Sequence, residues 1–190
     1  IVANLINPEA ISNTVSDIVK GGGVDIVLIA QGSLSEQAEC QEDLQACQDA
    51  LEVNGISPVL YAEAFAKEME RTGHGKIALI ASVAGDRGRK SNYVYGAAKG
   101  LITRYAQGLQ HRFSGTAVRV VLIKPGPTDT PMTSVFKNMG AKLAAVDTVA
   151  KQIVEGIDNG QLVIYTPKKW WLIMKVLQHL PSQIFNRLNL

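Results

Sequence analysis

The chain has 190 residues, a formal net charge of +2 and 46% hydrophobic residues. This length and composition predict one α/β domain with a hydrophobic core of its own. The weak charge, with no Lys/Arg block interleaved with aromatic residues, argues against a nucleic-acid-binding protein. No apolar run reaches the roughly 20 residues that a membrane-spanning helix requires.

The cysteines and histidines do not predict a metal site. Cys40 and Cys47 are seven residues apart, which in a continuous helix places them on one face, two turns apart and too far for a disulfide. We therefore expect reduced cysteines in a cytoplasmic protein. The three histidines are scattered, and none has ligand spacing to the cysteines.

Helical and strand signals alternate along the chain. The first helix is predicted over residues 8–20, with Asn7 as its N-cap and three glycines after it. Further helices are predicted over 42–73, with a break at Asn54–Gly55 and Pro58, over 92–113, and over 147–158 with Asp147 as its cap. The apolar runs that predict strands lie at 24–30, 76–82, 118–124 and 159–166.

Each predicted strand is uniformly apolar, as expected when both faces of a sheet are covered. Strands that alternate with helices predict an α/β fold with a doubly wound parallel sheet of the Rossmann type. Ligands bind such sheets at the carboxyl ends of the strands. The segments expected to form a site are therefore 30–32, 82–85 and 125–130.

Three polar residues with regular spacing fall in this region. Tyr95 and Lys99 are four residues apart, so they share one face of a helix. The small residues between them let another backbone or a flat cofactor approach closely. Ser82 adds a hydroxyl at the carboxyl end of a strand. A second Tyr-x-x-x-Lys spacing, Tyr165 and Lys169, contains a proline directly after a strand and is predicted to lack the helical geometry.

These residue types suit proton transfer to or from a carbonyl or alcohol oxygen. A phenol with an ordinary pKa of about 10 is a poor base at neutral pH. A neighbouring lysine cation is expected to lower that pKa, and a serine hydroxyl can bond the same substrate oxygen.

Ser82, Tyr95 and Lys99 in this spacing resemble the catalytic set of the short-chain dehydrogenases/reductases. Asn54 lies in the preceding helix, where that family keeps its fourth catalytic residue. The segment IAQG (29–32) resembles in part the family's Asn-Asn-Ala-Gly, and PGPTDT (125–130) matches its Pro-Gly-x-x-x-Thr loop. Asn4 stands where the family often has an Asp that contacts adenine.

The resemblance implies an NAD- or NADP-dependent enzyme that reduces a carbonyl to an alcohol. Tyr95 would protonate the developing alkoxide, Lys99 would lower the pKa of Tyr95 and hold the nicotinamide ribose, and Ser82 would position the carbonyl. Asn54 would hold a water in a proton relay to Lys99. The cofactor would be bound by Asn4, Ala30, Gly32, Tyr95, Lys99, Pro125, Gly126 and Thr130.

The segments 24–34, 82–100 and 165–188 are similar to the decaprenylphosphoryl-2-keto-ribose reductases of cell-wall polysaccharide synthesis. This closer likeness implies a keto sugar carried on a polyprenyl phosphate as the substrate. The segment DRGRK (86–90) at the mouth of the site is interpreted as a solvated loop or as a binding site for a substrate phosphate.

The family's first strand and its Gly-rich phosphate loop have no counterpart in this sequence. We therefore expect a single partial Rossmann-type domain over residues 1–190. Either the protein carries the missing part outside this sequence, or it is a short, catalytically impaired relative that acts as an oligomerising or binding module. In a short chain, the strand at 24–30 would be left as an open edge.

Residues 168–190 are predicted to form an amphipathic helix and tail, with Trp170, Ile173, Met174, Leu177 and Leu180 along one stripe. This helix either packs on its own domain or meets a membrane surface, where paired tryptophans beside lysines are common. A location at the inner face of a membrane is the corresponding expectation. The resemblance also implies a homo-oligomer that pairs through the helices at 53–72 and 92–113.

Overall fold

The computed structural model describes residues 5–188. Asn4 and its expected contact with adenine lie outside the described residues. The strands are β1 (Ile26–Ile29), β2 (Gly75–Ile80), β3 (Val118–Pro125) and β4 (Val163–Thr166). The α-helices are α1 (Pro8–Lys20), α2 (Gln37–Glu42), α3 (Leu44–Leu51), α4 (Ser57–Thr72), α5 (Tyr93–Arg112), α6 (Ser134–Asn138), α7 (Val146–Asp158), α8 (Lys169–His179) and α9 (Ser182–Phe185).

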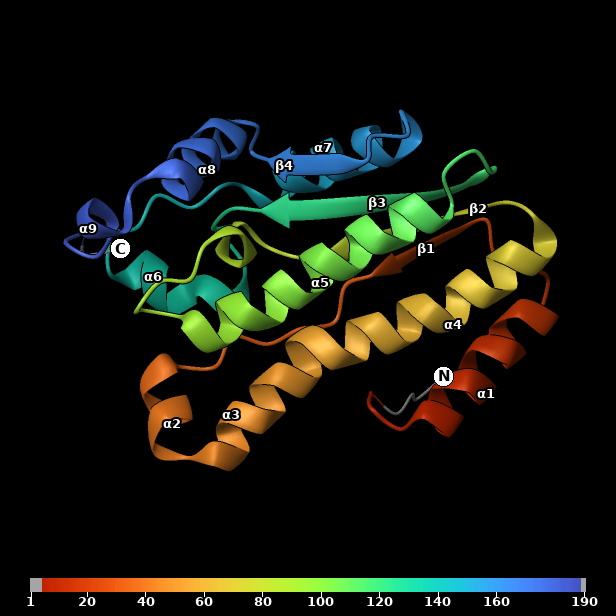
Figure 1. Cartoon of the computed structure of the whole chain (residues 1–190), viewed down its shortest axis with the longest axis horizontal. Helices are drawn as coiled ribbons and strands as arrows, with labels where there is room; N and C mark the ends of the chain where they lie inside the picture. Colours follow the sequence, from red (N-terminus) through yellow and green to blue (C-terminus); the bar gives the residue numbers. More distant parts are fainter. Residues whose placement is uncertain (1–4, 189–190) are drawn as a thin grey trace.

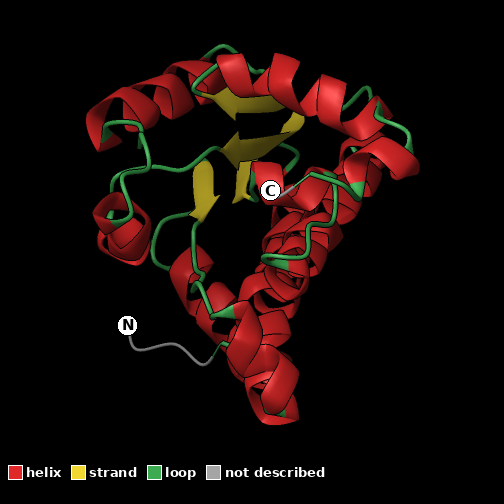
Figure 2. Ribbon diagram, turned by 90° about the vertical axis from the view of Figure 1, so that its left-hand side faces the viewer, coloured by secondary structure: helices red, strands yellow, loops and turns green. Residues whose placement is uncertain are grey.

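The four strands form one parallel sheet in the order β1-β2-β3-β4 (Figure 1). Helices lie on both sides of this sheet, which Figure 2 shows from the end toward which the strands point. The predicted parallel α/β fold of the Rossmann type is confirmed.

Alternate side chains of the central strands enter two separate cores. Ile77, Leu79 and Leu122 pack against α1, α4 and α5 on one face. Ala78 and Val121 pack against α7 on the other face. The uniformly apolar strand sequences follow from this double coverage.

Strand β1 is the edge of the sheet within the described part of the chain. Its Ile26 and Leu28 are about half exposed, at 48% and 49%. Leu28 is in register with Ala78, so it points to the same face of the sheet as the core residues that pack against α7. One side of β1 is therefore apolar and only partly covered by the described residues.

The first helix, α1, begins at Pro8, as the sequence predicts. The Asn7 side chain accepts a hydrogen bond from the Ala10 backbone N–H at 2.8 Å and caps α1. The expected cap at Asp147 is wrong, because α7 begins one residue earlier and has Ala145 at its N-cap. Asp147 lies instead in the first turn, where a carboxylate still favours the positive end of the helix dipole.

Cys40 and Cys47 do not share a helix. Asp43 is extended and separates α2 from α3, and its side chain accepts a hydrogen bond from the Gln45 N–H at 2.8 Å. The helix that contains Cys47 therefore has its own N-cap four residues before that cysteine. Both cysteines are free thiols.

The expected break at Asn54–Gly55 is a change of helix type. The chain stays helical through a π-helical turn, η1 (Glu52–Ile56), which joins α3 to α4. Such a turn contains one extra residue, and π-turns occur frequently at functional sites. Asn54 lies within this turn and is buried.

Candidate active site

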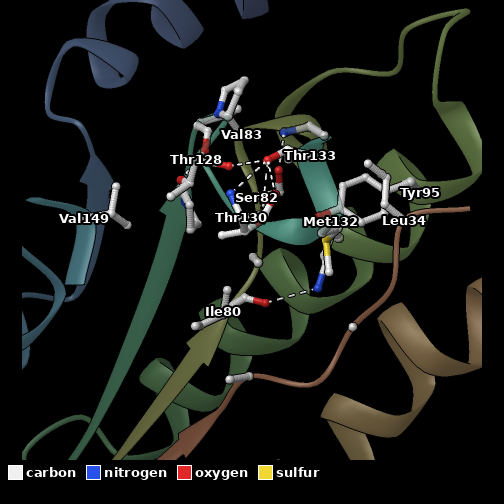
Figure 3. Close-up of a pocket in the computed structure, with 18 of the residues that line it drawn as sticks. Leu34, Ile80, Ser82, Val83, Tyr95, Thr128, Thr130, Met132, Thr133 and Val149 are labelled. Atoms are coloured by element: carbon white, nitrogen blue, oxygen red, sulfur yellow. Dashed lines mark hydrogen bonds between the residues drawn. The ribbon is translucent and has the colours of Figure 1, made fainter. Parts of the chain in front are cut away.

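A cavity of about 750 Å³ opens at the carboxyl ends of the strands (Figure 3). This volume is typical of small-molecule and cofactor sites. The structure brings Ser82, Tyr95, Lys99 and Asn54 together in its wall. The residues predicted to bind a cofactor within the described range also line it, namely Ala30, Gly32, Pro125, Gly126 and Thr130.

Close packing of a short turn against α5 brings Ser82 to Tyr95. The turn is the 3-10 segment η2 (Val83–Asp86), directly after Ser82. A Cβ on Gly85 would lie 2.6 Å from the Lys99 carbonyl carbon, and one on Gly96 would lie 3.0 Å from the Ala84 oxygen. The small residues of α5 thus admit another backbone, one of the two possibilities raised by the sequence.

The Ser82 side chain interacts with the Tyr95 hydroxyl and lowers its pKa. The Ser82 oxygen also accepts the Ala84 N–H at 3.1 Å, which fixes its orientation at the end of β2. Burial raises the pKa of Tyr95, and its hydrogen bond to Ser82 opposes that effect. The pKa of Tyr95 therefore lies above its ordinary value, opposite to the direction expected from a neighbouring lysine, because desolvation is the largest influence on it.

Lys99 is buried, and its Nζ donates to the Ile80 carbonyl at 3.2 Å. The same nitrogen lies 5.7 Å from the centre of the Tyr95 ring. Burial lowers the pKa of Lys99 to about 8. Both groups are therefore protonated at neutral pH: Tyr95 is a neutral phenol, and Lys99 is a cation beside it.

Asn54 is completely buried behind this pair. Its Oδ1 accepts the Ser33 N–H at 2.9 Å, and its Nδ2 donates to the Ala50 carbonyl at 2.9 Å. A Cβ on Gly32 would lie 3.0 Å from Asn54 Oδ1 and 3.4 Å from Lys99 Nζ. Gly32 therefore leaves space between these two polar groups that any other residue would fill.

The loop after β3 forms the opposite wall. Thr130 and Thr133 make a reciprocal cap, with the Thr130 N–H donating to the Thr133 hydroxyl at 3.2 Å. The indole of Trp170, from α8, lies against Gly126, where a Cβ would be 1.9 Å from the indole nitrogen. The C-terminal helix thus contributes directly to the cavity.

A buried ion pair below η2 was not predicted from the sequence. Asp86 and Lys124 are paired, with side chains only 1% and 5% exposed, and the Tyr165 hydroxyl donates to Asp86 at 2.8 Å. Burial and this hydrogen bond raise the pKa of Tyr165. The interpretation of residue 86 as part of a solvated loop is wrong. A lysine inside an otherwise apolar strand was the available signal, since a buried charge requires a partner.

Arg87 joins this turn to the C-terminal helices. Its Nη1 donates to the carbonyl oxygens of Leu177 and Leu180, and its guanidinium lies 3.8 Å from the centre of the Phe185 ring. The turn that follows Ser82 is thus held by β3 and β4 on one side and by α8 and α9 on the other.

Helix α8 has two apolar surfaces. Trp170 and Met174 face the protein, whereas Trp171, Leu172 and Val176 are 53%, 62% and 56% exposed. The predicted stripe is therefore mainly a packing surface. Within residues 5–188, no helix is both long and apolar enough to cross a membrane.

A parallel α/β sheet with a serine, a tyrosine and a lysine converging beside a cofactor-sized cavity defines an oxidoreductase of the Rossmann type. The chain belongs to the short chain dehydrogenase family, whose model matches residues 1–141.

Curated relatives share most of the length of the chain. An uncharacterized oxidoreductase encoded in the mprA 5' region of Streptomyces coelicolor is 28% identical over 184 residues, which are 96% of this chain and 72% of the relative. An uncharacterized oxidoreductase of Mycobacterium tuberculosis is 27% identical over 171 residues, which are 90% of this chain and 68% of the relative.

Solved structures share the fold at lower identity. A short chain dehydrogenase from Burkholderia cenocepacia, crystallised with NADP, gives a TM-score of 0.84 at 20% identity and covers 100% of this chain and 78% of its own. The bulky-bulky ketone specific alcohol dehydrogenase from Comamonas testosteroni gives a TM-score of 0.77 at 20% identity and covers 100% and 73%.

Proposed function

We propose that the protein is an NAD(P)H-dependent reductase that converts a carbonyl to an alcohol. The observation that carries this proposal is the convergence of Ser82, Tyr95 and Lys99 on one wall of the cavity, with the Ser82 side chain interacting with the Tyr95 hydroxyl. A serine and a protonated tyrosine that point to one place can bond and protonate a single oxygen atom.

The residues around the cavity fit a nicotinamide cofactor. Gly32 leaves an unfilled space between Asn54 and Lys99, and the only charged side chains among the described lining residues are cations. The similar structure from Burkholderia cenocepacia holds NADP, and one from Burkholderia phymatum holds NAD. Ala30, Gly32, Pro125, Gly126 and Thr130 would hold the cofactor, which supplies the hydride when bound.

Each polar residue then has one task. Ser82 donates to the substrate carbonyl oxygen and orients it. As negative charge develops on that oxygen, Tyr95 transfers its phenolic proton to it, and the product is an alcohol. Lys99, on the same face of α5, stabilises the phenolate that remains and returns a proton to it. Asn54 fixes the loop at Ser33 and faces the same space as Lys99, where we place the proton relay to solvent.

The direct test measures turnover with NADH and NADPH against a panel of ketones, using the purified full-length protein. We expect reduced nicotinamide to be consumed and Tyr95→Phe to lower kcat by about 10²- to 10⁴-fold, the usual contribution of a positioned general acid. Cofactor binding should be retained in this variant.

Tyr93→Phe is the matched control, because Tyr93 lies two residues earlier in α5 and its hydroxyl contacts Gln41. It should keep full activity. Saturable binding of neither cofactor, together with no turnover, would contradict the proposal and favour the non-catalytic binding module instead.

For the substrate, we propose a keto sugar on a lipid phosphate. The similarity of residues 165–188 to the decaprenylphosphoryl-2-keto-ribose reductases suggests this class. Helix α8 supports it physically, since Trp170 lines the cavity while Trp171, Leu172 and Val176 remain exposed on its outer side. Lys168, Lys169 and Lys175 lie beside them, a composition suited to an anionic membrane surface.

Co-sedimentation with vesicles that contain an anionic phospholipid tests the surface contact. We expect wild-type protein to bind and the double variant Trp171→Ser/Leu172→Ser to lose binding. Leu162→Ser is the control, because Leu162 is similarly exposed at 56% but lies outside α8. Equal binding by all three proteins would show that α8 does not make the contact.

A further inference from the structure

The cavity has an unusual balance of charge. Among the described residues that line it, the charged ones are Arg89 and Lys99, and no aspartate or glutamate faces them. Lys99 already donates to the Ile80 carbonyl and lies beside Tyr95. Arg89 is therefore the cation that the proposed chemistry does not use.

The Arg89 side chain is partly buried and has no hydrogen-bond or ion-pair partner within residues 5–188. Its Nε is enclosed by protein and bonds to nothing there. Other arginines of the chain are satisfied: Arg87 donates to carbonyl oxygens, and Arg112 pairs with Glu63 and Glu70. An enclosed guanidinium without an acceptor is unfavourable, and burial lowers the pKa of Arg89. Its position is explained if a ligand supplies the acceptor.

Asn92 lies beside Arg89 in the same turn and shares this property. The Asn92 N–H donates to the Arg89 carbonyl at 3.1 Å, which holds the two residues together. Asn92 occupies the N-cap position of α5, yet within the described part of the chain its side chain makes no capping bond and its buried Oδ1 has no hydrogen-bond partner. Both residues line the cavity. The turn therefore presents several N–H donors and, beside them, one free acceptor.

We propose that Arg89 and Asn92 form a subsite that binds an oxyanion of the substrate, either a phosphate or a carboxylate, together with a neighbouring hydroxyl. The planar guanidinium matches both oxyanions in bidentate geometry, and the Asn92 carbonyl accepts from the hydroxyl. This inference rests on the proposed reductase function and narrows its substrates to anionic carbonyl compounds. Arg89 and Asn92 lie in the segment of the chain that connects Ser82 to Tyr95. The anion would therefore be held beside the residues that bind the carbonyl.

The test compares matched neutral and anionic ketones. Dihydroxyacetone and its phosphate form one pair, and ethyl acetoacetate and acetoacetate form the other. In one of the two pairs, the wild-type protein should show a higher kcat/KM for the anionic member than for the neutral one. The pair that shows this preference tells whether the oxyanion is a phosphate or a carboxylate. Arg89→Gln should lower this preference by about 10- to 100-fold, the usual effect of losing hydrogen bonds to a charged group, while the neutral member is still reduced. Arg89→Lys should restore part of it.

Lys90→Gln is the matched control, because Lys90 is adjacent, exposed and outside the cavity lining. It should leave the preference unchanged. Equal kcat/KM for both members of each pair in wild type, an unchanged preference in Arg89→Gln, or an equal loss in Lys90→Gln would overturn the proposal.

A second readout does not depend on turnover. Phenylglyoxal modifies accessible arginines, and mass spectrometry of the labelled protein locates them. Inorganic phosphate or acetate should slow labelling of Arg89 but not of the exposed Arg104. If no ketone is reduced, the reductase proposal fails and this readout alone decides the subsite: protection of Arg89 supports it, and labelling at the same rate with and without the anions overturns it.

Discussion

Lys99 lies where its charge is poorly solvated, and this placement makes the proposed chemistry dependent on pH. Burial lowers its pKa to about 8, whereas burial raises that of Tyr95. The fraction of Lys99 that carries a charge therefore falls as the pH rises through 8, and Tyr95 stays protonated over the same range. We therefore expect Lys99 to be the group that limits the proposed activity on the basic side.

We expect log(kcat/KM) for ketone reduction to fall above about pH 8, because kcat/KM reports the ionisations of the free enzyme. Lys99→Arg should remove this limb, since arginine stays charged, even where its absolute rate is lower. A pH profile of both proteins checks the expectation. If kcat/KM of Lys99→Arg fell at the same pH, the ionisation responsible would belong to another group.

The same shift affects stability. The folded-state pKa of Lys99 lies below its unfolded value, so the unfolded chain binds more protons between about pH 8 and 10.5. The contribution of this residue to the free energy of unfolding should therefore rise with pH across that window. Urea titrations of wild type and Lys99→Met at pH 7.5 and 9.5, values that bracket the lowered pKa, should show a difference that changes with pH. A constant difference would contradict the assignment.

Gly126 illustrates how one missing side chain shapes the cavity wall. We expect Gly126→Ala to destabilise the protein by about 1–3 kcal/mol, the usual cost of overpacking, because its Cβ would occupy the position of the Trp170 indole. Gly88→Ala should change stability by less than about 0.5 kcal/mol, since nothing lies within 4 Å of its Cβ. Denaturant unfolding measures both, and equal effects would show that Trp170 moves away freely.

At the scale of elements, the turn η2 is the point where several parts of the fold meet. Ser82 directly precedes this turn, and Gly85 within it packs against α5. At its end, Asp86 pairs with Lys124 of β3 and accepts a hydrogen bond from Tyr165 of β4. Arg87 then attaches it to α8 and α9. The position of the Ser82 hydroxyl therefore depends on contacts with residues up to about 100 positions away in the sequence.

We expect Asp86→Asn to destabilise the fold by about 3–5 kcal/mol, because it leaves the Lys124 charge buried without its partner. Replacing both residues, as in Asp86→Leu/Lys124→Met, should recover much of this loss. The control is Asp129→Asn, which breaks the exposed Lys137–Asp129 pair and should cost about 0–1 kcal/mol. Chemical denaturation of the wild type and these three variants measures the free energy of unfolding. A small effect of Asp86→Asn would mean that the pair is well solvated.

At the scale of the whole molecule, the outer face of α5 is available for a second copy. Leu101 is 45% exposed there, and Ala97 and Gly108 on the same face are small. Helix α4 lies alongside and is tied to α5 through Arg112, which pairs with Glu63 and Glu70. These two helices are the pair through which we propose that the protein forms a homo-oligomer.

We expect light scattering to give a mass that is a multiple of the chain mass, and Leu101→Asp to reduce it to that of one chain, because a charge at a close helix contact is not solvated. Leu162→Asp, at an exposed position outside both helices, should keep the wild-type mass. A single-chain mass for wild type would contradict the proposed oligomer.

The sequence by itself determined the order of the elements and the members of the Ser82, Tyr95 and Lys99 set. Those features depend on local periodicity, on capping by residues such as Asn7, and, for Tyr95 and Lys99, on a spacing that one helix imposes. Only the tertiary structure decided the direction of the Tyr95 pKa shift, the separation of Cys40 from Cys47, and the partners of Asp86 and Arg87. These depend on burial and on contacts between distant segments, because desolvation and ion pairing are set by what surrounds a group in space.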